Sequence, residues 1–357
     1  MKAIRLHRTG PAEVLELEDI PLPKPGPGEA LVRIHAAGLN FADIYMRNGS
    51  YPAPISLPFT PGLEGAGVVE AIGKGVAEAS DGGASNVRPG DRVSYLALQY
   101  GAYADYQIVK ANHLIPLPPG MTFETAAAIT LQGMTAHSLV YENYPVTPGV
   151  TVLVHAAAGG MGLVLVQWLK HLGARVIGTV STEEKGQAAR EAGADHVILY
   201  TREDFAAETK RLTDGKGADY IIDGVGKSTF ARNLDAVSTR GHITLYGWSS
   251  GPPDSILPAA LMAKSVAISG GGLGNFINTR EEILSRARSA FEGVQGGWLK
   301  PRIGSVFPLA EAARSASAAG KSPNRRQTGL ADRSLIRRHR PHADTGAWNT
   351  VEKSCGC

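Results

Sequence analysis

The sequence predicts a doubly wound α/β domain joined to a compact β-rich domain. An apolar strand that starts at Val152 leads into a glycine-rich turn and then into an amphipathic helix that reaches Lys170. Short β-branched runs then alternate with segments that suit helices. The N-terminal third instead shows strand patterns separated by turns. A chain of 357 residues with 43% hydrophobic content is long enough for two such domains.

Strand patterns begin in the N-terminal third at residues 30–38 and recur at residues 66–72. Residues 88–95 place a Pro-Gly turn before another strand. The small, polar residues 78–86 are typical of a surface loop between strands. This third therefore predicts the β-rich domain.

The glycine-rich turn has the spacing of a dinucleotide site. Ala156, Gly159 and Gly162 stand at AxxGxxG spacing, which permits a tight turn and a close approach of the backbone to a pyrophosphate. The unsatisfied N–H groups that open the following helix suit an anion. The alternative is an ordinary strand-to-helix turn, and the βα units that follow favour the dinucleotide site.

Five further strands are predicted after this turn. They lie at residues 176–180, 196–199, 220–223, 242–246 and 265–269, and residues 183–192 and 202–213 suit connecting helices. Strands joined by crossover helices form a parallel sheet.

The end of the second of these strands favours NADPH over NADH. A carboxylate there would bind the ribose 2′-OH and repel a 2′-phosphate, but the chain offers Thr179, Ser181, Thr182 and Lys185. The acids at residues 183–184 are counter-evidence. They are also typical of the first turn of a helix that Ser181 or Thr182 caps.

Charge and cysteine content limit the class of protein. The net charge is +3, but residues 314–357 carry nine Lys and Arg against three Asp and Glu. We expect this basic end to be a solvated, disordered tail, while binding of residues 337–340 to nucleic acid or anionic lipid is the less favoured alternative. The cysteines are Cys355 and Cys357. No apolar run approaches the roughly 20 residues of a membrane span, and the N-terminus lacks a signal-peptide core, so we expect a cytoplasmic protein.

Ordered motifs give the chain a specific resemblance. Residues 38–45, 61–69, 89–93, 131–136 and 156–162 resemble the medium-chain dehydrogenase/reductase superfamily, and within it the zinc-free, zeta-crystallin-like quinone oxidoreductases. The match runs from the start to about Ala313. It implies a GroES-like β-rich domain over residues 1–122, completed by about residues 270–313. It also implies a Rossmann NADP(H)-binding domain over residues 123–269, and a homodimer.

After Arg314 the sequence departs from this family. The family has a helix and a final strand there, whereas residues 315–357 are small and basic and lack sustained apolar periodicity. Residues 325–329 resemble a remnant of the turn before that strand, and one of its arginines would then reach the 2′-phosphate. Without the strand, the β-rich domain would present an unpaired edge.

A zinc site is not expected. Zinc-dependent relatives have Cys where this chain has Asn40, and His where it has Leu63, and they carry a four-cysteine lobe that is absent here. Leu63 has no lone pair for a metal and an amide is a poor zinc ligand.

Hydrogen-bond donors must then polarise the substrate oxygen. Asn40 supplies an amide NH₂ and Tyr45 a phenol, and their spacing lets both reach one small pocket. The alternative is that Asn40 only caps the helix and Tyr45 is a core aromatic. The resemblance implies that both line the quinone site, and that Tyr51 is a further active-site tyrosine.

The resemblance also implies cofactor contacts. Lys185 and Tyr200 match the 2′-phosphate contacts of the family, and segments after the last two strands are expected to face the nicotinamide. The full set of cofactor residues is Gln132, Thr135, Ala158, Gly159, Gly160, Met161, Gly162, Ser181, Lys185, Tyr200, Gly247, Trp248 and Ser249.

These observations predict an NADPH-dependent, metal-free quinone oxidoreductase whose substrate is a quinone or another conjugated carbonyl. A second enzymatic interpretation is reduction of the C=C bond of enones or enals. A third, of another class, is a non-catalytic NADPH-binding protein, either structural or RNA-binding. Low turnover with tight NADPH binding would favour the third.

Overall fold

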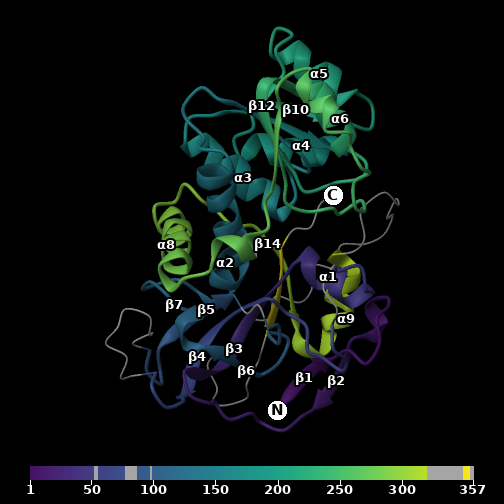
Figure 1. Cartoon of the computed structure of the whole chain (residues 1–357). Coiled ribbons are helices and arrows are strands. Elements are labelled where there is room, and N and C mark those ends of the chain that lie inside the picture. Colours follow the sequence, from purple (N-terminus) through teal and green to yellow (C-terminus); the bar gives the residue numbers. More distant parts are fainter. Residues whose placement is uncertain (52–54, 77–86, 97–98, 320–348, 354–357) are drawn as a thin grey trace.

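The computed structural model describes residues 1–51, 55–76, 87–96, 99–319 and 349–353. The chain forms two lobes, a β-rich lobe that holds the N-terminus and a lobe built on a parallel sheet (Figure 1). Among the described residues, no helix is long and apolar enough to cross a membrane. The predicted fold class is confirmed.

The β-rich lobe contains a seven-stranded sheet that combines both ends of the described chain. Its order is β14-β15-β3-β4-β5-β7, with β6 paired to β3, and a separate two-stranded sheet holds β1 and β2. The strands are β1 (Lys2–Arg5), β2 (Glu16–Asp19), β3 (Glu29–Leu39), β4 (Glu64–Ile72), β5 (Arg92–Leu96), β6 (Tyr106–Lys110), β7 (Leu114–Pro116), β14 (Ile303–Pro308) and β15 (Asn349–Lys353). β3, β4 and β5 match the predicted strands, while the predicted loop at residues 78–86 lies outside the described residues.

The second lobe has the predicted parallel sheet. Its order is β10-β9-β8-β11-β12-β13, and every neighbouring pair is parallel. The strands are β8 (Thr151–Val154), β9 (Arg175–Val180), β10 (His196–Leu199), β11 (Ala218–Asp223), β12 (Val237–Leu245) and β13 (Ala267–Gly270). The strand order reverses between β8 and β11, and ligands bind at such a switch point in open α/β sheets.

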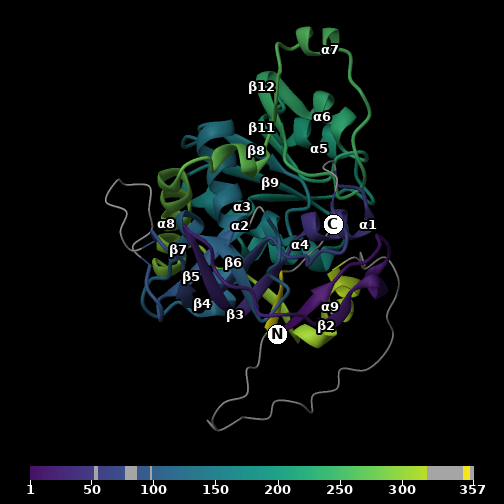
Figure 2. The ribbon, with the colours of Figure 1, turned by 60° about the horizontal axis from the view of Figure 1, so that its bottom comes forward.

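Helices cover this sheet and connect its strands. They are α3 (Gly160–His171), α4 (Glu183–Glu191), α5 (Phe205–Leu212), α6 (Phe230–Ala236) and the short α7 (Ala259–Met262). Figure 2 shows α7 at the far end of this lobe, remote from the β-rich lobe. Thr182 accepts a hydrogen bond from the Lys185 backbone N–H, so the predicted cap of α4 is confirmed at Thr182.

Helix α2 (Phe123–Ser138) lies where the two lobes meet, beside α8 (Arg280–Gln295) (Figure 1). A Cβ on Gly133 would lie 2.5 Å from the Ala290 Cβ, so the glycine lets the two helices pack closely. Most of α2 is buried. The sequence did not predict this helix, because a helix buried on nearly all sides has no polar stripe to mark its period.

The prediction of an unstructured end after Arg314 was wrong at two places. Residues 312–319 form α9 (Ala312–Ala319), and β15 pairs antiparallel with β14 and parallel with β3. The alanine-rich segment suits a helix, and the strand is held by backbone pairing, which needs no apolar periodicity. The turn remnant at residues 325–329 and the basic residues 337–340 lie outside the described residues.

Candidate active site

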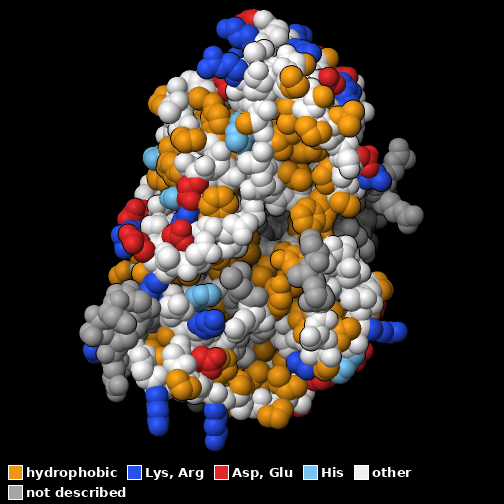
Figure 3. Space-filling view, in the orientation of Figure 1, with side chains coloured by type: hydrophobic (Ala, Val, Ile, Leu, Met, Phe, Trp, Pro, Cys, Tyr) orange, Lys and Arg blue, Asp and Glu red, His pale blue; other side chains and the backbone are white. Residues whose placement is uncertain are grey.

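A cavity of about 350 Å³ lies between the two lobes, at the carboxyl edge of the parallel strands. Twelve of the predicted site residues line it. They are Asn40, Tyr45, Tyr51, Gln132, Thr135, Gly159, Gly160, Met161, Gly162, Gly247, Trp248 and Ser249. Residues 271–273, in the segment after β13 that was expected to face the nicotinamide, also line it, as do Leu39, Phe41, Leu63, Leu131, Tyr246 and Gly274, which were not predicted as site residues. Figure 3 shows apolar side chains on the parallel-sheet lobe that continue towards the junction of the lobes.

The glycine-rich turn forms one wall of the cavity. Ala156 has a φ of 51°, and the Gly159 N–H donates to the Ala156 carbonyl at 2.9 Å. A Cβ on Gly162 would lie 2.2 Å from the same carbonyl oxygen, so α3 packs against the turn as closely as a glycine allows. The first N–H groups of α3 have no partner within the helix and carry partial positive charge. This wall fits a pyrophosphate.

A buried network that the sequence analysis missed supports this wall from behind. His155 directly precedes the turn, and its ring nitrogens lie 2.9 Å from the Thr179 hydroxyl and 2.8 Å from the Asn233 amide oxygen. Asn233 donates its amide N–H to Asp223 at 2.7 Å. The network joins β9, β11 and α6 to the end of β8. A polar residue directly after an apolar strand was the available signal.

The residues expected at a 2′-phosphate lie at the end of β9 and outside the cavity lining. Lys185 donates from Nζ to the Ser181 hydroxyl at 3.0 Å. Tyr200 follows Leu199, which pairs with Val180 at the end of β9. Glu183, the counter-evidence in the sequence, pairs with Arg190 at 2.8 Å. The charge of Glu183 is thereby partly neutralised, while Glu184 remains as an acid near this end of the strand.

Ser249 and Ala158 complete the cofactor set. The Ser249 hydroxyl oxygen is buried and has no hydrogen-bond partner among the described residues, although it faces the cavity. A buried hydroxyl without a partner costs free energy, so it fits a site that a ligand completes. Ala158 is buried in the turn and does not line the cavity.

Asn40 stands at the start of helix α1 (Phe41–Asn48), where β3 ends. It is the N-cap residue, and its backbone N–H donates to the Asp43 carboxylate at 2.9 Å. Its side-chain Nδ2 donates to Glu64 Oε1 at 2.7 Å. The side chain also lines the cavity. The capping position and the cavity position, which the sequence presented as alternatives, are therefore both occupied.

Glu64 was given no role by the sequence analysis. Its side chain is fully buried, and Oε2 accepts the backbone N–H of Leu131 in α2 at 2.8 Å. A Cβ on Gly38 would lie 2.3 Å from Glu64 Oε1, so the glycine provides the space for this carboxylate. The signal was an acid at the start of an apolar strand.

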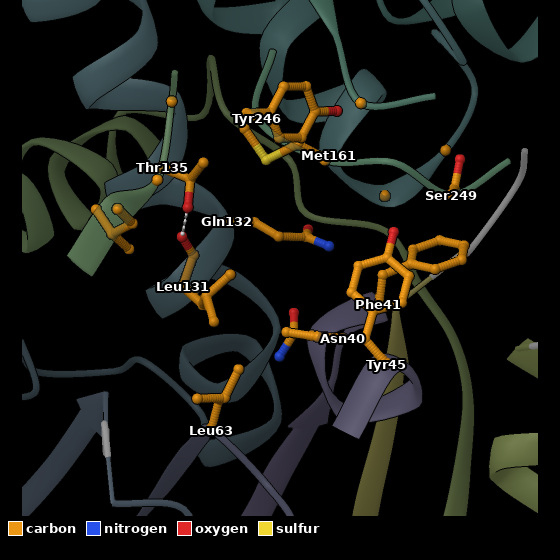
Figure 4. A pocket seen from close by; sticks show the side chains of 18 of the residues that line it. Asn40, Phe41, Tyr45, Leu63, Leu131, Gln132, Thr135, Met161, Tyr246 and Ser249 are labelled. Atoms are coloured by element: carbon orange, nitrogen blue, oxygen red, sulfur yellow. Dashed lines mark hydrogen bonds between the residues drawn. The ribbon is translucent and has the colours of Figure 1, made fainter. Parts of the chain in front are cut away.

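Tyr45 stacks on Trp248 across the junction of the lobes, with ring centroids 5.4 Å apart and an interplanar angle of 9°. Phe41 lies beside it at 6.1 Å. Figure 4 shows the Tyr45 hydroxyl pointing away from α1 into the cavity. Tyr45 is therefore an aromatic of the cavity wall.

Tyr51 lines the cavity next to Tyr100. Burial, together with the hydrogen bond and charge of the Tyr51 hydroxyl, raises the pKa of Tyr100 to about 12. Tyr100 has a φ of 59°, in the left-handed region that non-glycine residues seldom adopt. A hydrogen bond joins the two phenols, and Tyr100 remains protonated at neutral pH.

Gln132 and Thr135 project from α2 into the cavity from the side of the junction. Thr135 donates its hydroxyl to the Leu131 carbonyl at 2.7 Å (Figure 4). Gln132 is 8% exposed, and its side chain has no hydrogen-bond partner among the described residues. Figure 4 shows the Gln132 amide directed into the cavity, towards the side on which Tyr45 lies.

Potential metal ligands do not gather at this cavity in the described part of the chain. Leu63 forms an apolar part of its wall near Asn40 (Figure 4). Within the described ranges, the cluster with metal-ligand spacing is His7, Glu16 and Glu18, and none of these lines the cavity.

Comparisons with known proteins agree with this geometry. The sequence profile of the alcohol dehydrogenase GroES-like domain matches residues 26–119, and that of zinc-binding dehydrogenases matches residues 160–289. The chain is 41% identical over 315 residues to a quinone oxidoreductase of Pseudomonas aeruginosa, covering 88% of this chain and 94% of the relative. It is 38% identical over 330 residues to a 2-haloacrylate reductase of Burkholderia, covering 90% and 95%. The structure of Escherichia coli quinone oxidoreductase complexed with NADPH superposes with a TM-score of 0.84 at 33% identity, over 99% of this chain and all of the other.

Proposed function

The chain belongs to the zinc-free quinone oxidoreductases of the medium-chain dehydrogenase/reductase superfamily, and we propose that it reduces a quinone with NADPH. The observation that carries the proposal is the cavity between the lobes. One wall is the pyrophosphate-binding turn at residues 156–162, and the other carries Asn40 and Tyr45 in an apolar surface. A cofactor and a flat acceptor can meet there without water.

When bound, NADPH supplies a hydride from nicotinamide C4. The N–H groups at the start of α3 would bind the pyrophosphate, while Ser181, Lys185 and Tyr200 would bind the 2′-phosphate. Residues that line the cavity would hold the nicotinamide end, namely Thr135, Gly247, Trp248 and Ser249, and Ala158 shapes the turn. Gln132, which the sequence also assigned to the cofactor, is directed towards the side of Tyr45. Preference for NADPH follows from the Lys185–Ser181 pair and from the lack of an acid at residues 179–182.

The acceptor lies against Asn40, Tyr45 and Tyr51. Transfer of the hydride to the quinone would give the hydroquinone monoanion, and the Tyr45 hydroxyl would stabilise its negatively charged oxygen as a donor. A proton from solvent then completes the hydroquinone. Leu63 has no atom that can bind a metal and the Asn40 amide is a poor zinc ligand, so the reaction is proposed to be metal-independent.

Reduction of a conjugated C=C bond is a second candidate. The resemblance to a 2-haloacrylate reductase favours it, because such a substrate needs the same hydride but presents a carbon to it. The two reactions differ only in which atom faces the nicotinamide. Product identity separates them.

We further propose a homodimer in which a second copy covers the outer edge of β13. In the described part of the chain, β13 pairs only with β12, so its other edge is open. Leu257 and Met262, in the segment before β13, are 77% and 78% exposed.

We also propose a cytoplasmic location, the absence of a nucleic-acid partner, and domain limits at residues 122 and 269.

The test is a panel of quinones and enones with NADPH and NADH in parallel, with each product identified. We expect hydroquinone from quinones and faster turnover with NADPH. Tyr45→Phe should lower kcat about tenfold and leave NADPH binding intact, because its hydroxyl acts on charge that develops in the transition state. Tyr106→Phe, outside the cavity, is the matched control. Tight NADPH binding with negligible turnover on every acceptor would favour the non-catalytic class instead.

A further inference from the structure

The orientation of the Asn40 amide is set by a buried carboxylate. Glu64 Oε2 accepts a backbone N–H, from Leu131 at 2.8 Å, and Oε1 lies 2.7 Å from Asn40 Nδ2. The donor in this contact is the Asn40 Nδ2, so the NH₂ group of Asn40 is turned towards Glu64 and its oxygen away from it. Figure 4 shows the result, with the Asn40 nitrogen on the side of Leu63 and its oxygen directed towards Gln132.

Burial makes this orientation hard to reverse. Glu64 is fully buried and Asn40 is 6% exposed. The Asn40 backbone is fixed as well, because its N–H donates to Asp43. If the amide turned over, its oxygen would face the carboxylate oxygen with no water to separate them. The wall of the cavity therefore presents a hydrogen-bond acceptor at Asn40.

Gln132 supplies the hydrogen-bond donor that Asn40 does not present to the cavity. The residue is 8% exposed, its amide is directed into the cavity, and no hydrogen bond joins it to another residue in the described part of the chain. An amide in this position is available to a group that enters the cavity. Because Gln132 follows Leu131, whose N–H is held by Glu64, one carboxylate positions both amides.

We propose that Gln132, together with Tyr45, donates to the substrate oxygen that gains negative charge, that Asn40 accepts a hydrogen bond from the substrate side, and that Glu64 is the positioning residue. The proposal rests on the proposed function for its substrate. Hydride transfer converts the quinone to the hydroquinone monoanion: the hydride pair forms the new bond to hydrogen, and the displaced π electrons leave negative charge on a substrate oxygen, where Gln132 and Tyr45 stabilise it. A solvent proton then converts that oxygen to a hydroxyl, which can donate to the Asn40 oxygen.

The decisive variant is Glu64→Gln. The oxygen of the new amide must stay at the Leu131 N–H, because a backbone N–H can only donate, so its NH₂ group faces Asn40. Asn40 must then turn its own oxygen to residue 64 and its NH₂ group to the cavity. The substitution thus changes the wall from acceptor to donor with almost no change in volume. Glu70→Gln, on the exposed part of the same strand, is the matched control.

The probe is 4-nitrophenol, whose phenolate absorbs visible light and resembles the reduced oxygen of a substrate. We expect Glu64→Gln to bind a larger fraction as phenolate than the unmodified protein at the same pH. Gln132→Met should bind a smaller fraction and should lower kcat about tenfold with little change in KM, since it removes one donor. Gln187→Met, on the exposed face of α4, is its control.

Thermal unfolding and NADPH binding establish that each variant is folded. An unchanged or smaller phenolate fraction in folded Glu64→Gln would overturn the assignment of Asn40, and an unchanged kcat in Gln132→Met would overturn that of Gln132. The nitrophenol titration needs no turnover. If the unmodified protein reduces no quinone, the proposed function fails while the titration still tests the amide orientation.

Discussion

The two walls of the cavity are built by different means. The cofactor wall is mainly backbone, with a left-handed residue at Ala156, a helix N-terminus and a glycine at residue 162, all within one short segment. The substrate wall is mainly side chains joined over long distances in sequence. Asn40 and Glu64 lie 24 residues apart, and Glu64 and Leu131 lie 67 residues apart.

This difference determines how each wall can fail. A wall built from backbone binds the cofactor through its shape and partial charges, so its affinity for the cofactor falls when a side chain fills the space or a charged contact is removed. A wall built from side chains determines which groups donate and which accept hydrogen bonds. An isosteric substitution can therefore exchange a donor for an acceptor while the fold persists. Substitutions on the two sides should therefore have different signatures.

The largest effect should come from filling the cofactor wall. Gly162→Ala would place a Cβ 2.2 Å from the Ala156 carbonyl oxygen, and neither backbone can move cheaply. We expect a loss of about 3 kcal/mol of unfolding free energy and about hundredfold weaker NADPH binding, measured by thermal unfolding and fluorescence titration. Gly270→Ala, where a Cβ meets nothing within 4 Å and which does not line the cavity, is the control. Equal NADPH affinity in both variants would show that close packing of this turn is not needed.

Removal of charge from the cofactor wall should have the next largest effect. Lys185→Ala loses one charge-assisted contact to the 2′-phosphate, which is about 1.5–3 kcal/mol, or about ten- to hundredfold in the Kd for NADPH. The Kd for NADH should hardly change. Lys210→Ala, on the exposed side of α5, controls for the loss of a surface charge. A parallel loss for both cofactors would contradict the assignment.

A smaller effect is expected where the walls touch. Trp248→Ala removes the ring that stacks on Tyr45, and an aromatic pair is worth about 0.5–1.5 kcal/mol beyond its buried area. Turnover should fall severalfold, whereas Trp248→Phe should keep most of it. If the alanine variant matches the unmodified protein in both kcat and KM, the stack does not position Tyr45.

The smallest effect, none, is expected from chelators. Leu63 and Asn40 occupy the wall where a metal would be needed, and neither is a good zinc ligand. Quinone turnover should be the same after dialysis against a chelator and after addition of zinc. Loss of activity that zinc restores would place a metal in the substrate wall.

The same contrast explains what the sequence predicted. The cofactor wall was predicted because its turn, its helix and its strand are contiguous, and their residue types have few other uses. Asn40 and Tyr45 were also placed correctly in one cavity, since a strand end and the next helix bring them together. The donor role that the sequence predicted for Asn40 differs from the geometry, in which its NH₂ group donates to Glu64. Glu64 is distant in sequence, and only the folded sheet brings it near.

Two elements of the fold escaped prediction for related reasons. Helix α2 is apolar on nearly every side, so its sequence carries no helical period, although it forms the junction of the lobes. Strand β15 is fixed by backbone pairing with β3 and β14, and such pairing leaves little trace in the residues themselves.

Strand β15 also imposes an order on biosynthesis. The ribosome makes β3 early, but its parallel neighbour comprises residues 349–353. The strands of the nucleotide-binding lobe, from Thr151 to Gly270, emerge before that neighbour and can fold as a unit during translation. The nascent protein should therefore be able to bind its cofactor before the β-rich lobe is complete, because the sheet of that lobe needs β15 beside β3.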